Sequence, residues 1–263
     1  MYYLCIDLSK ICSIIGYIRK HMNSFISRII VAVFVVTPVV FFIVISHSIP
    51  VAFADSSLVA SYSFDEGAGT SFTDQSGNGN AGILSNGAAF TPDGKYGGAI
   101  DLDGVNELAT VTDSSSLDLT SGMTLEAWVK PSVVTGWRTI LLMSSGNDLA
   151  YSLYANSSSN KPDFQINNGA TVYETFGVTK LVLNAWAHIA GTYDGTTLKI
   201  YVNGNLVSQK TVTASALITT GKLFIGGNTV WGEYFKGLID DVRIYSKTLI
   251  QSEIQNDMNS PVN

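Results

Sequence analysis

Cysteine and histidine are scarce in most of this 263-residue chain. Both cysteines, Cys5 and Cys12, lie in the first 54 residues, and His188 is the single histidine of residues 55–263. Residues 55–263 therefore cannot form a disulfide framework or a zinc site of the usual cysteine–histidine type.

Positive charge is also scarce beyond residue 54. Four of the 15 lysines and arginines precede residue 55, but only one of the 21 acidic residues does, which leaves 11 basic and 20 acidic groups in residues 55–263. The resulting net charge of −9 argues against a nucleic-acid partner, because phosphate binding needs clustered lysine and arginine. A domain of this size can bury about 70% of its unfolded surface, so one domain is expected.

The one long hydrophobic run lies near the N-terminus and has the three parts of a secretory signal peptide. Arg28 precedes an apolar run over residues 29–45, and small residues in A-x-A spacing end at Ala54. We therefore expect residues 1–54 to be a signal-peptide region with a hydrophobic helix, cleaved after Ala54, and Met22 is a candidate start of translation.

An uncleaved membrane anchor is the alternative for the same run. It has 17 residues and contains Pro38, whereas a spanning helix needs about 20 apolar residues. Both alternatives place residues 55–263 outside the cytoplasm, either secreted or at the cell surface. Contact with a membrane is expected only if the leader is retained.

Alternation of apolar and polar residues dominates the chain from residue 55 onward. Leu198, Ile200 and Val202, for example, alternate with more polar residues, as in a half-buried strand. Strands are expected near residues 58–64, 99–102, 107–112, 123–130, 138–144, 149–155, 163–167, 186–193, 197–203, 206–212, 222–226 and 237–245. So many short strands predict an all-β fold, a two-sheet antiparallel jelly-roll sandwich.

Two tight turns connect three of these strands. Asp194-Gly195 and Asn203-Gly204 tolerate the positive φ that hairpin turns require. Residues 186–212 are therefore expected to form a three-stranded antiparallel meander.

A short C-terminal helix is expected to follow the last strand. Thr248 and Gln251 have the spacing of a capping box. The apolar stripe that would face the sandwich consists of Leu249, Ile250, Ile254 and Met258.

Seven separated motifs occur in the order that is typical of one family. They are YSFDEGAG (62–69), DQSGNGNAG (74–82), GGAIDLDG (97–104), MTLEAWVKP (123–131), AWAHIAGTYDGTTLKIYVNG (185–204), LFIGG (223–227) and FKGLIDDVRIYSKTL (235–249). Together they resemble the laminin-G-like jelly-roll domains of the concanavalin A-like lectin/glucanase superfamily, over about residues 58–258. The resemblance implies one domain over residues 55–263 with two packed sheets, one of them curved, and calcium and sugar sites are common among relatives. It does not determine the ligand.

The carboxylate strand of the superfamily's glycosidases is absent. The resemblance implies that a catalyst would carry Glu-x-Asp-x-Glu, with nucleophile and acid on one face of a strand. Glu126 instead has Thr124 and Trp128 as neighbours on its face, and Asp240 and Asp241 would point to opposite faces. We therefore expect a domain that is not an enzyme, and a degenerate glycosidase is disfavoured.

A calcium loop is suggested by the segment from Asp74 to Asn80. It has the oxygen-rich first half of a D-x-[DNS]-x-[DNS]-G loop, but position 12 is Ser85 instead of a bidentate glutamate. A glycine-rich turn without an ion is the alternative interpretation.

The late strand adds a second calcium candidate. The motif GLIDDVRIY resembles that of laminarinase-type relatives, which implies a calcium-binding aspartate at Asp240. Strand alternation would place Asp240 on the buried side with Leu238, Val242 and Ile244, where a carboxylate needs a cation or another partner. One Ca²⁺ is expected at Asp240, with Asp65, Asp74 and Asn80 as candidate ligands. An ion pair with Arg243 or Lys236 is the alternative.

Sugars are bound by aromatic faces and polar side chains at a concave surface or loop rim. Trp128 and Trp186 fall in strand motifs and are expected to pack between the sheets, whereas Trp137 and Trp231 lie in polar, glycine-containing stretches. The candidate carbohydrate-binding residues are Trp137, Arg138, Asn228, Trp231 and Tyr234. The alternative is that a loop tryptophan closes the end of the sandwich.

These observations predict a secreted or surface-attached, non-catalytic binding module for carbohydrate recognition or adhesion, whose partner is an extracellular glycan or a surface protein. A protein–protein interaction or surface-assembly module of the same fold is the alternative function.

Overall fold

The computed structural model describes residues 55–262 and two strands of the leader, β1 (Ile30–Val36) and β2 (Val39–Ile45). These strands pair antiparallel with each other, and the expected hydrophobic helix of the leader stays a prediction. Valine, isoleucine and phenylalanine make up most of both strands, and such residues favour extended backbone. The expected cleavage after Ala54 and the candidate start at Met22 lie outside the described residues. Within the described ranges, no helix has the length and apolar character needed to span a membrane.

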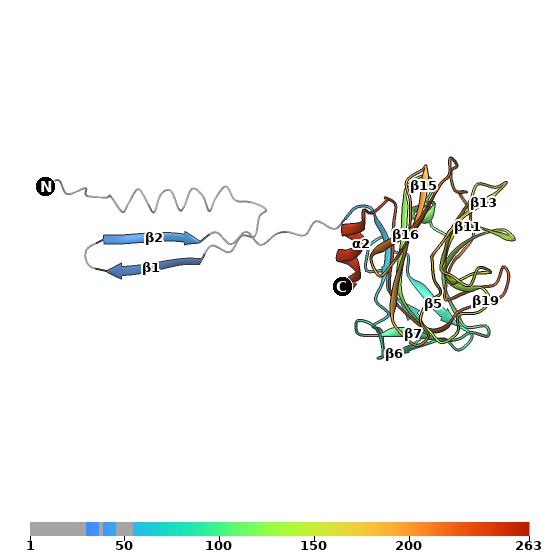
Figure 1. Cartoon of the computed structure of the whole chain (residues 1–263). Coiled ribbons are helices and arrows are strands. Elements are labelled where there is room, and N and C mark those ends of the chain that lie inside the picture. Colours follow the sequence, from blue (N-terminus) through green and yellow to red (C-terminus); the bar gives the residue numbers. More distant parts are fainter. Residues whose placement is uncertain (1–29, 37–38, 46–54, 263) are drawn as a thin grey trace. The chain divides into compact units, whose positions relative to one another are not determined.

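Two antiparallel sheets form the domain that begins after the leader (Figure 1). The front sheet has the order β13 (Val172–Phe176), β12 (Asp163–Asn167), β11 (Asp148–Asn156), β10 (Arg138–Ser145), β17 (Leu223–Ile225), β8 (Leu108–Val111), β5 (Gly82–Ser85) and β4 (Ser71–Phe72). The back sheet has the order β16 (Asn205–Thr211), β15 (Thr197–Val202), β14 (Ala187–Tyr193), β9 (Met123–Pro131), β20 (Lys236–Tyr245), β7 (Ala99–Asp103) and β6 (Ala89–Thr91), with β3 (Leu58–Tyr62) also paired to β20. This arrangement confirms the all-β two-sheet sandwich.

All twelve expected strands are present, and the predicted meander is formed by β14, β15 and β16. Its second turn has φ of 51° at Asn203 and 71° at Gly204, which fits the Asn-Gly signal. The sequence did not reveal β4, β5, β6 and β13, nor β18 (Gly227–Asn228) and β19 (Glu233–Tyr234), which pair with each other. Alternation is hard to recognise in strands this short, and three of them, β4, β18 and β19, have only two residues.

The core lies between the inner faces of the two sheets. Leu125, Ala127 and Val129 on β9 alternate inward, and they belong to the same buried cluster as Phe164 and Ile166 on β12. The alternation read from the sequence therefore correctly identified the faces of most strands.

Gly191 on β14 leaves space for the ring of Phe164, because a Cβ atom at Gly191 would lie 2.4 Å from Phe164 Cγ. Gly191→Ala is expected to destabilise the domain by about 1–3 kcal/mol through overpacking. Urea denaturation measures the loss. Gly122→Ala, where the nearest non-adjacent atom would be 3.3 Å away, is the control with a smaller expected loss. Equal losses for the two variants would contradict this account.

The helix α2 (Gln251–Met258) covers the outer face of the back sheet. Leu249 and Ile254 pack against Ala190, Tyr201 and Tyr245 of that sheet. Ile250, also assigned to the apolar stripe, is 63% exposed. The predicted stripe is therefore correct only in part.

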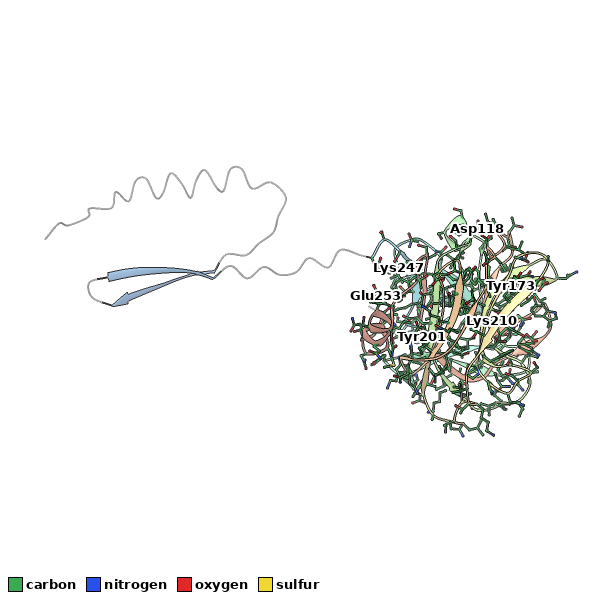
Figure 2. All side chains as sticks on the ribbon, turned by 45° about the horizontal axis from the view of Figure 1, so that its top comes forward. Asp118, Tyr173, Tyr201, Lys210, Lys247 and Glu253 are labelled. Carbon is green, nitrogen blue, oxygen red and sulfur yellow. The ribbon has the colours of Figure 1, made fainter. Side chains whose placement is uncertain are left out.

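The predicted capping box is wrong, because the helix begins later than the sequence indicated. The Glu253 carboxylate accepts a hydrogen bond from the backbone N–H of Ile250 (2.8 Å), while the Thr248 hydroxyl donates to the carbonyl of Tyr193. Lys247 Nζ lies 3.2 Å from Glu253 Oε1 and 2.8 Å from Asp55 Oδ2, beside the start of α2 (Figure 2).

The predicted orientation of Asp240 is wrong, because β20 contains a β-bulge at this point. The register with β9 shifts between Asp240 and Arg243, and Asp241 has a φ of +45°. The extra residue reverses the alternation, so Ile239 and Val242 both reach the core. Asp240 therefore does not share the inner face with Val242, as strand parity predicted.

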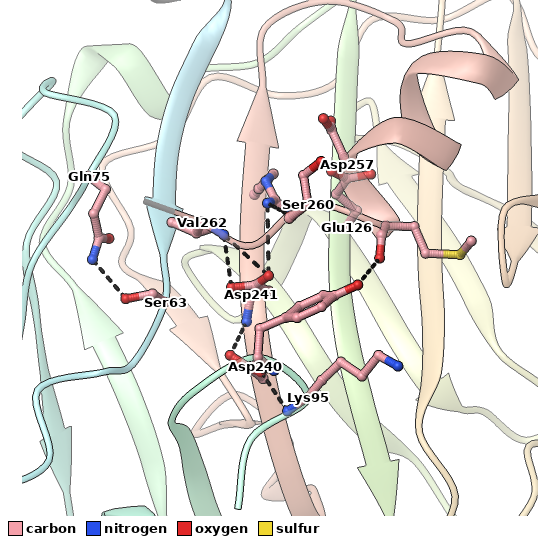
Figure 3. A network of polar contacts seen from close by, with 12 residues as sticks. Ser63, Gln75, Lys95, Glu126, Asp240, Asp241, Asp257, Ser260 and Val262 are labelled. Carbon is pink, nitrogen blue, oxygen red and sulfur yellow. Dashed lines mark hydrogen bonds and ion pairs between the residues drawn. The ribbon is translucent and has the colours of Figure 1, made fainter. Parts of the chain in front are cut away.

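Asp240 and Asp241 both contact segments that cover the outer face of the back sheet, although parity had predicted opposite faces (Figure 3). Asp240 Oδ2 accepts hydrogen bonds from the backbone N–H groups of Lys95 (2.8 Å) and Tyr96 (2.9 Å). Asp241 accepts one from the N–H of Val262 in the C-terminal segment. The bulge thus brings two adjacent carboxylates to one side of the strand.

Candidate functional site: an aromatic and acidic pocket on the front sheet

A pocket of about 310 Å³ opens on the outer face of the front sheet. Strands β11 and β13 and the short β19 lie on the side of the domain opposite α2 (Figure 1). The lining residues come from the start of β10, from β11, β12 and β13, and from the β18–β19 hairpin. They are Trp137, Asp148, Leu149, Tyr154, Gln165, Val172, Trp231 and Glu233.

Strand alternation explains why these side chains face outward. Phe164 and Ile166 on β12 point into the core, so Gln165 between them points to the pocket. Likewise Leu153 on β11 is in the core and Tyr154 is on the outer face. The pocket floor is therefore part of the sheet, where hydrogen bonds between neighbouring strands position its side chains.

The aromatic part of the pocket contains both tryptophans that the sequence singled out. The rings of Trp137 and Tyr154 meet edge to face, with centroids 4.9 Å apart and an interplanar angle of 67°. Trp231 is 44% exposed, and its backbone N–H donates to Asn228 Oδ1 (2.9 Å), which holds the hairpin in place. A fixed and partly exposed tryptophan offers a flat apolar surface to a ligand.

Glu233 supplies a carboxylate beside this aromatic surface. Its Oε2 accepts hydrogen bonds from the Tyr154 hydroxyl (3.0 Å) and from Asn228 Nδ2 (3.1 Å). Partial burial raises the pKa of Glu233, while the two hydrogen bonds oppose that rise. The two donors orient the carboxyl group at the pocket wall.

Arg138, Asn228 and Tyr234 support the site and do not line it. The Arg138 guanidinium donates from Nε to the carbonyl of Thr135 (2.9 Å) and from Nη1 to that of Tyr234 (2.7 Å). Tyr234 is half-buried and packs against the apolar cluster under the pocket. Of the five residues predicted to bind carbohydrate, the structure thus brings only Trp137 and Trp231 to the pocket.

Four polar residues that line the pocket were not predicted from the sequence: Tyr154, Gln165, Asp148 and Glu233. Tyr154 and Gln165 lie in expected strands, and their outward parity was a usable signal. Asp148 and Glu233 lie beside strand ends, where the sequence does not show which distant segments meet.

A buried carboxyl group, Asp163, lies next to the pocket. Gln165 Nε2 donates to Asp163 Oδ2 (2.7 Å) and is 3.3 Å from Glu174 Oε2. Burial raises the pKa of Asp163 from 3.8 to about 7, and the hydrogen bond from Gln165 only partly opposes this.

The raised pKa of Asp163 predicts a pH dependence of stability. Between about pH 4 and pH 7 the folded state retains a proton that the unfolded state releases, so this contribution is fully present below pH 4 and is lost as the pH rises to 7. The wild type is expected to lose free energy of unfolding between pH 4 and pH 7.5. In Asp163→Asn this loss is expected to be smaller by about 2–4 kcal/mol. Urea denaturation at both pH values tests this, and parallel profiles of wild type and variant would refute it.

The only histidine of residues 55–263 is enclosed beside a buried glutamate. His188 Nε2 lies 3.8 Å from Glu126 Oε2, and neither side chain is exposed. Burial lowers the pKa of His188 to about 3, so its imidazole is neutral near pH 7, and burial raises the pKa of Glu126 well above its usual value. A pair enclosed in this way has no path to a polysaccharide.

The expected packing of Trp128 and Trp186 between the sheets is wrong. Trp128 is buried on the outer face of the back sheet, edge to face with His188 (centroids 5.4 Å apart) and beneath Lys95 Nζ, 4.5 Å from the ring centroid. Trp186 is half-exposed and precedes β14. Ala127 and Val129 of β9 point into the core, so the side chain of Trp128 between them points to the outer face of the sheet.

The four candidate calcium ligands lie in two places. Asp74 Oδ1 accepts from the N–H groups of Ser61 (3.0 Å) and Ser76 (2.9 Å), and its Oδ2 accepts from Asn80 N–H (2.9 Å). The amide of Asn80 donates to the carbonyl of Val59 (2.9 Å). Asp74 and Asn80 are therefore brought together, but their contacts are those of a hydrogen-bonded turn.

Asp65 and Asp240 both contact the segment 95–98. Gly98 N–H donates to Asp65 Oδ1, close to the hydrogen bonds that Lys95 and Tyr96 make to Asp240. Over the described residues, no three acidic, histidine or cysteine side chains are grouped so that they could hold a metal ion. The present side-chain positions therefore do not fit a single calcium ion bound by all four candidates.

A sequence comparison identifies the family of this fold. A family model for the concanavalin A-like lectin/glucanases superfamily matches residues 103–255. The chain belongs to this superfamily. The match confirms the resemblance inferred from the seven motifs and covers the front-sheet strands that form the pocket. A search of the curated proteins gave no match.

Several solved structures are similar to this chain, and they include binding domains. Domain 4 of AbnA, a GH43 extracellular arabinanase from Geobacillus stearothermophilus, in complex with arabinotriose, is 25% identical with a TM-score of 0.66, and the alignment covers 77% of this chain and 98% of that domain.

Two structures of one toxin domain share the fold at lower identity. The binding domain of botulinum neurotoxin DC in complex with SialylT is 15% identical (TM-score 0.63, 80% of this chain and 53% of that one). The same toxin domain in complex with rat synaptotagmin II is 15% identical (TM-score 0.61, 79% and 52%). The chain thus spans about half the length of these toxin domains.

Proposed function

We propose that residues 55–263 form a non-catalytic glycan-binding module of a secreted or surface-attached protein, acting in carbohydrate recognition or adhesion. The observation that carries the proposal is the front pocket, which combines Trp137, Trp231 and Tyr154 with hydrogen-bonding side chains on the front sheet. The similar arabinanase domain was determined in complex with arabinotriose, which supports a saccharide ligand.

The pocket has the chemistry that sugar recognition needs. The exposed face of Trp231 can stack on the C–H face of a sugar ring. Glu233 and Gln165 present oxygen atoms that accept hydrogen bonds from sugar hydroxyls. An apolar floor with a few convergent polar groups is the usual composition of a small-ligand site.

The non-catalytic part of the proposal is supported by the enclosure of the acid–base candidates. Glu126 and His188 have no exposed surface on the back sheet, and a general acid or base must reach the proton that it transfers. Release of reducing sugar from a polysaccharide panel, lost in Glu233→Gln or Asp148→Asn, would contradict this part.

Binding of the full chain to immobilised polysaccharides, including arabinan, tests the function. We expect retention on at least one polysaccharide and competition by its soluble oligosaccharide. No retention on any polysaccharide, with or without calcium, would overturn the proposal.

A protein partner is the second candidate function, because the segment between β13 and β14 exposes apolar side chains. Val178, Val182 and Leu183 are 59%, 71% and 49% exposed. Scattered exposed residues are ordinary, but several in one segment fit an interaction surface. Surface-protein capture that is abolished by Val182→Ser with Leu183→Ser, but not by Trp231→Ala, would favour this function.

Calcium binding stays a prediction, and among the candidate aspartates Asp65 has the carboxylate with the fewest hydrogen bonds within the fold. The Asp74 oxygens already accept three backbone hydrogen bonds within their own turn and its neighbouring strand, whereas Asp65 is exposed and accepts one. Calcium binding would raise the melting temperature of the chain in proportion to the logarithm of free calcium. An unchanged melting temperature after chelation and after calcium addition would contradict it.

A further inference from the structure

The front pocket carries negative charge and no opposing positive charge. Asp148 and Glu233 line it directly. A third lining residue, Gln165, is hydrogen-bonded to Asp163 and 3.3 Å from the carboxylate of Glu174. Within residues 55–262, neither lysine nor arginine lines this pocket.

The nearest arginine in the sequence is already engaged. Arg138 follows Trp137, but two of its guanidinium nitrogens donate to the carbonyls of Thr135 and Tyr234. Those hydrogen bonds hold the guanidinium against the backbone of the loop before β10 and of β19. Recognition of a sugar carboxylate normally uses the paired donors of an arginine or another cationic group.

The polar groups of the pocket are suited to a ligand that carries hydroxyl groups. The Tyr154 hydroxyl and Asn228 Nδ2 donate to Glu233 Oε2, so they orient a carboxyl group whose other oxygen can accept a hydrogen bond. Asp148 offers a second carboxylate near the rim of the same pocket. Carboxylates accept hydrogen bonds from sugar hydroxyls, but they repel the carboxylate of an acidic sugar.

We propose that this pocket binds uncharged glycan chains and rejects anionic ones, such as chains that contain uronic or sialic acids, through Asp148 and Glu233. This inference rests on the proposed glycan-binding function and names the class of saccharide that the same site takes. The aromatic surface of Trp137, Tyr154 and Trp231 supplies attraction to the sugar ring, which both classes share. The two carboxylates supply the discrimination, because only the anionic class carries a like charge.

The test compares neutral and anionic oligosaccharides of similar length on the full chain. Isothermal titration is performed with arabinotriose and galactotriose as neutral probes, and with trigalacturonate and sialyllactose as anionic probes. We expect the best neutral probe to bind about tenfold or more tightly than either anionic probe at low salt. The difference is expected to shrink in 0.5 M sodium chloride, because salt screens repulsion at a partly exposed site.

Two double variants, each lacking two negative charges, test whether the pocket carboxylates cause the preference for neutral over anionic saccharides. Asp148→Asn with Glu233→Gln removes two negative charges at the pocket. Asp93→Asn with Asp101→Asn removes two exposed charges from the other sheet, one just after β6 and one in β7. The first variant is expected to reduce the ratio of neutral to anionic affinity to about threefold or less. The second is expected to leave the ratio unchanged.

The outcomes separate this inference from the proposed function. Binding of no probe, and of no polysaccharide, would overturn both. Anionic probes that bind as tightly as the neutral ones, or equal effects of the two double variants, would overturn the charge discrimination while glycan binding stands. If Glu233→Gln disturbs Tyr154, the single variant Asp148→Asn is used, and a ratio that does not fall in it would likewise overturn the inference.

Discussion

Trp231→Ala is expected to weaken glycan binding about 10- to 100-fold without a measurable change in melting temperature. The side chain is 44% exposed in the free protein and lines the pocket, so its removal deletes contact with the ligand and little contact within the fold. Burial of a large apolar side chain against a ligand contributes roughly 1.5–3 kcal/mol, and each 1.4 kcal/mol corresponds to about tenfold in affinity. Titration with the oligosaccharide that binds the wild type gives the ratio.

Trp186→Ala is the matched control for this prediction. Trp186 is a half-exposed tryptophan that precedes β14 and does not line the pocket. Its replacement is expected to leave the affinity within about twofold of the wild type, since it deletes no ligand contact. Equal losses in the two variants, or a Trp231→Ala protein that binds normally, would show that the ligand lies elsewhere.

Arg243→Met is expected to lower the free energy of unfolding by about 3–5 kcal/mol at pH 7, the usual cost of leaving one member of a buried ion pair without its partner. Arg243 is 5% exposed and lies 3.8 Å from Asp241 Oδ2, and its guanidinium also donates to the carbonyl of Ser260. The substitution leaves the Asp241 carboxylate buried without its cation and releases the segment after α2. Guanidinium denaturation followed by tryptophan fluorescence measures the loss.

Lys236→Met, on the same strand, controls for removal of a positive charge. Lys236 is exposed at the start of β20, so its replacement is expected to change stability by less than about 0.5 kcal/mol. The account of the buried network would be wrong if Arg243→Met lost less than 1 kcal/mol, a size typical of surface ion pairs.

Much of the fold was predictable because it depends on local patterns. The alternation of β9, β14 and β15 and the Asn203-Gly204 turn follow from residue types a few positions apart. The motif order then identified the superfamily. Alternation failed at Asp240 and Asp241, because a bulge inserts one residue into a strand and nothing in the local sequence marks it.

The candidate site was predictable only in part. Trp137 and Trp231 were chosen because they lie in loop-like stretches, and both line the pocket. Their partners Tyr154 and Gln165 come from strands that are neighbours only through the sheet order β12–β11–β10. The role of Arg138 was not visible, because its hydrogen bonds run to carbonyls of Thr135 and of Tyr234, the latter 96 residues away in the chain.

The sequence by itself determined the all-β class, the superfamily, the acidic character of residues 55–263 and the lack of a glycosidase carboxylate strand. The fold class and the acidity depend on composition and short-range spacing, whereas the superfamily and the missing carboxylate strand follow from the resemblance of motifs spread over residues 62–249. Only the tertiary structure decided that Trp137, Trp231, Tyr154 and Glu233 share one pocket, and that His188 and Glu126 are enclosed beneath the covering segments of the back sheet. These facts depend on which distant strands pair and which face each side chain takes, and both are set by packing over the whole domain.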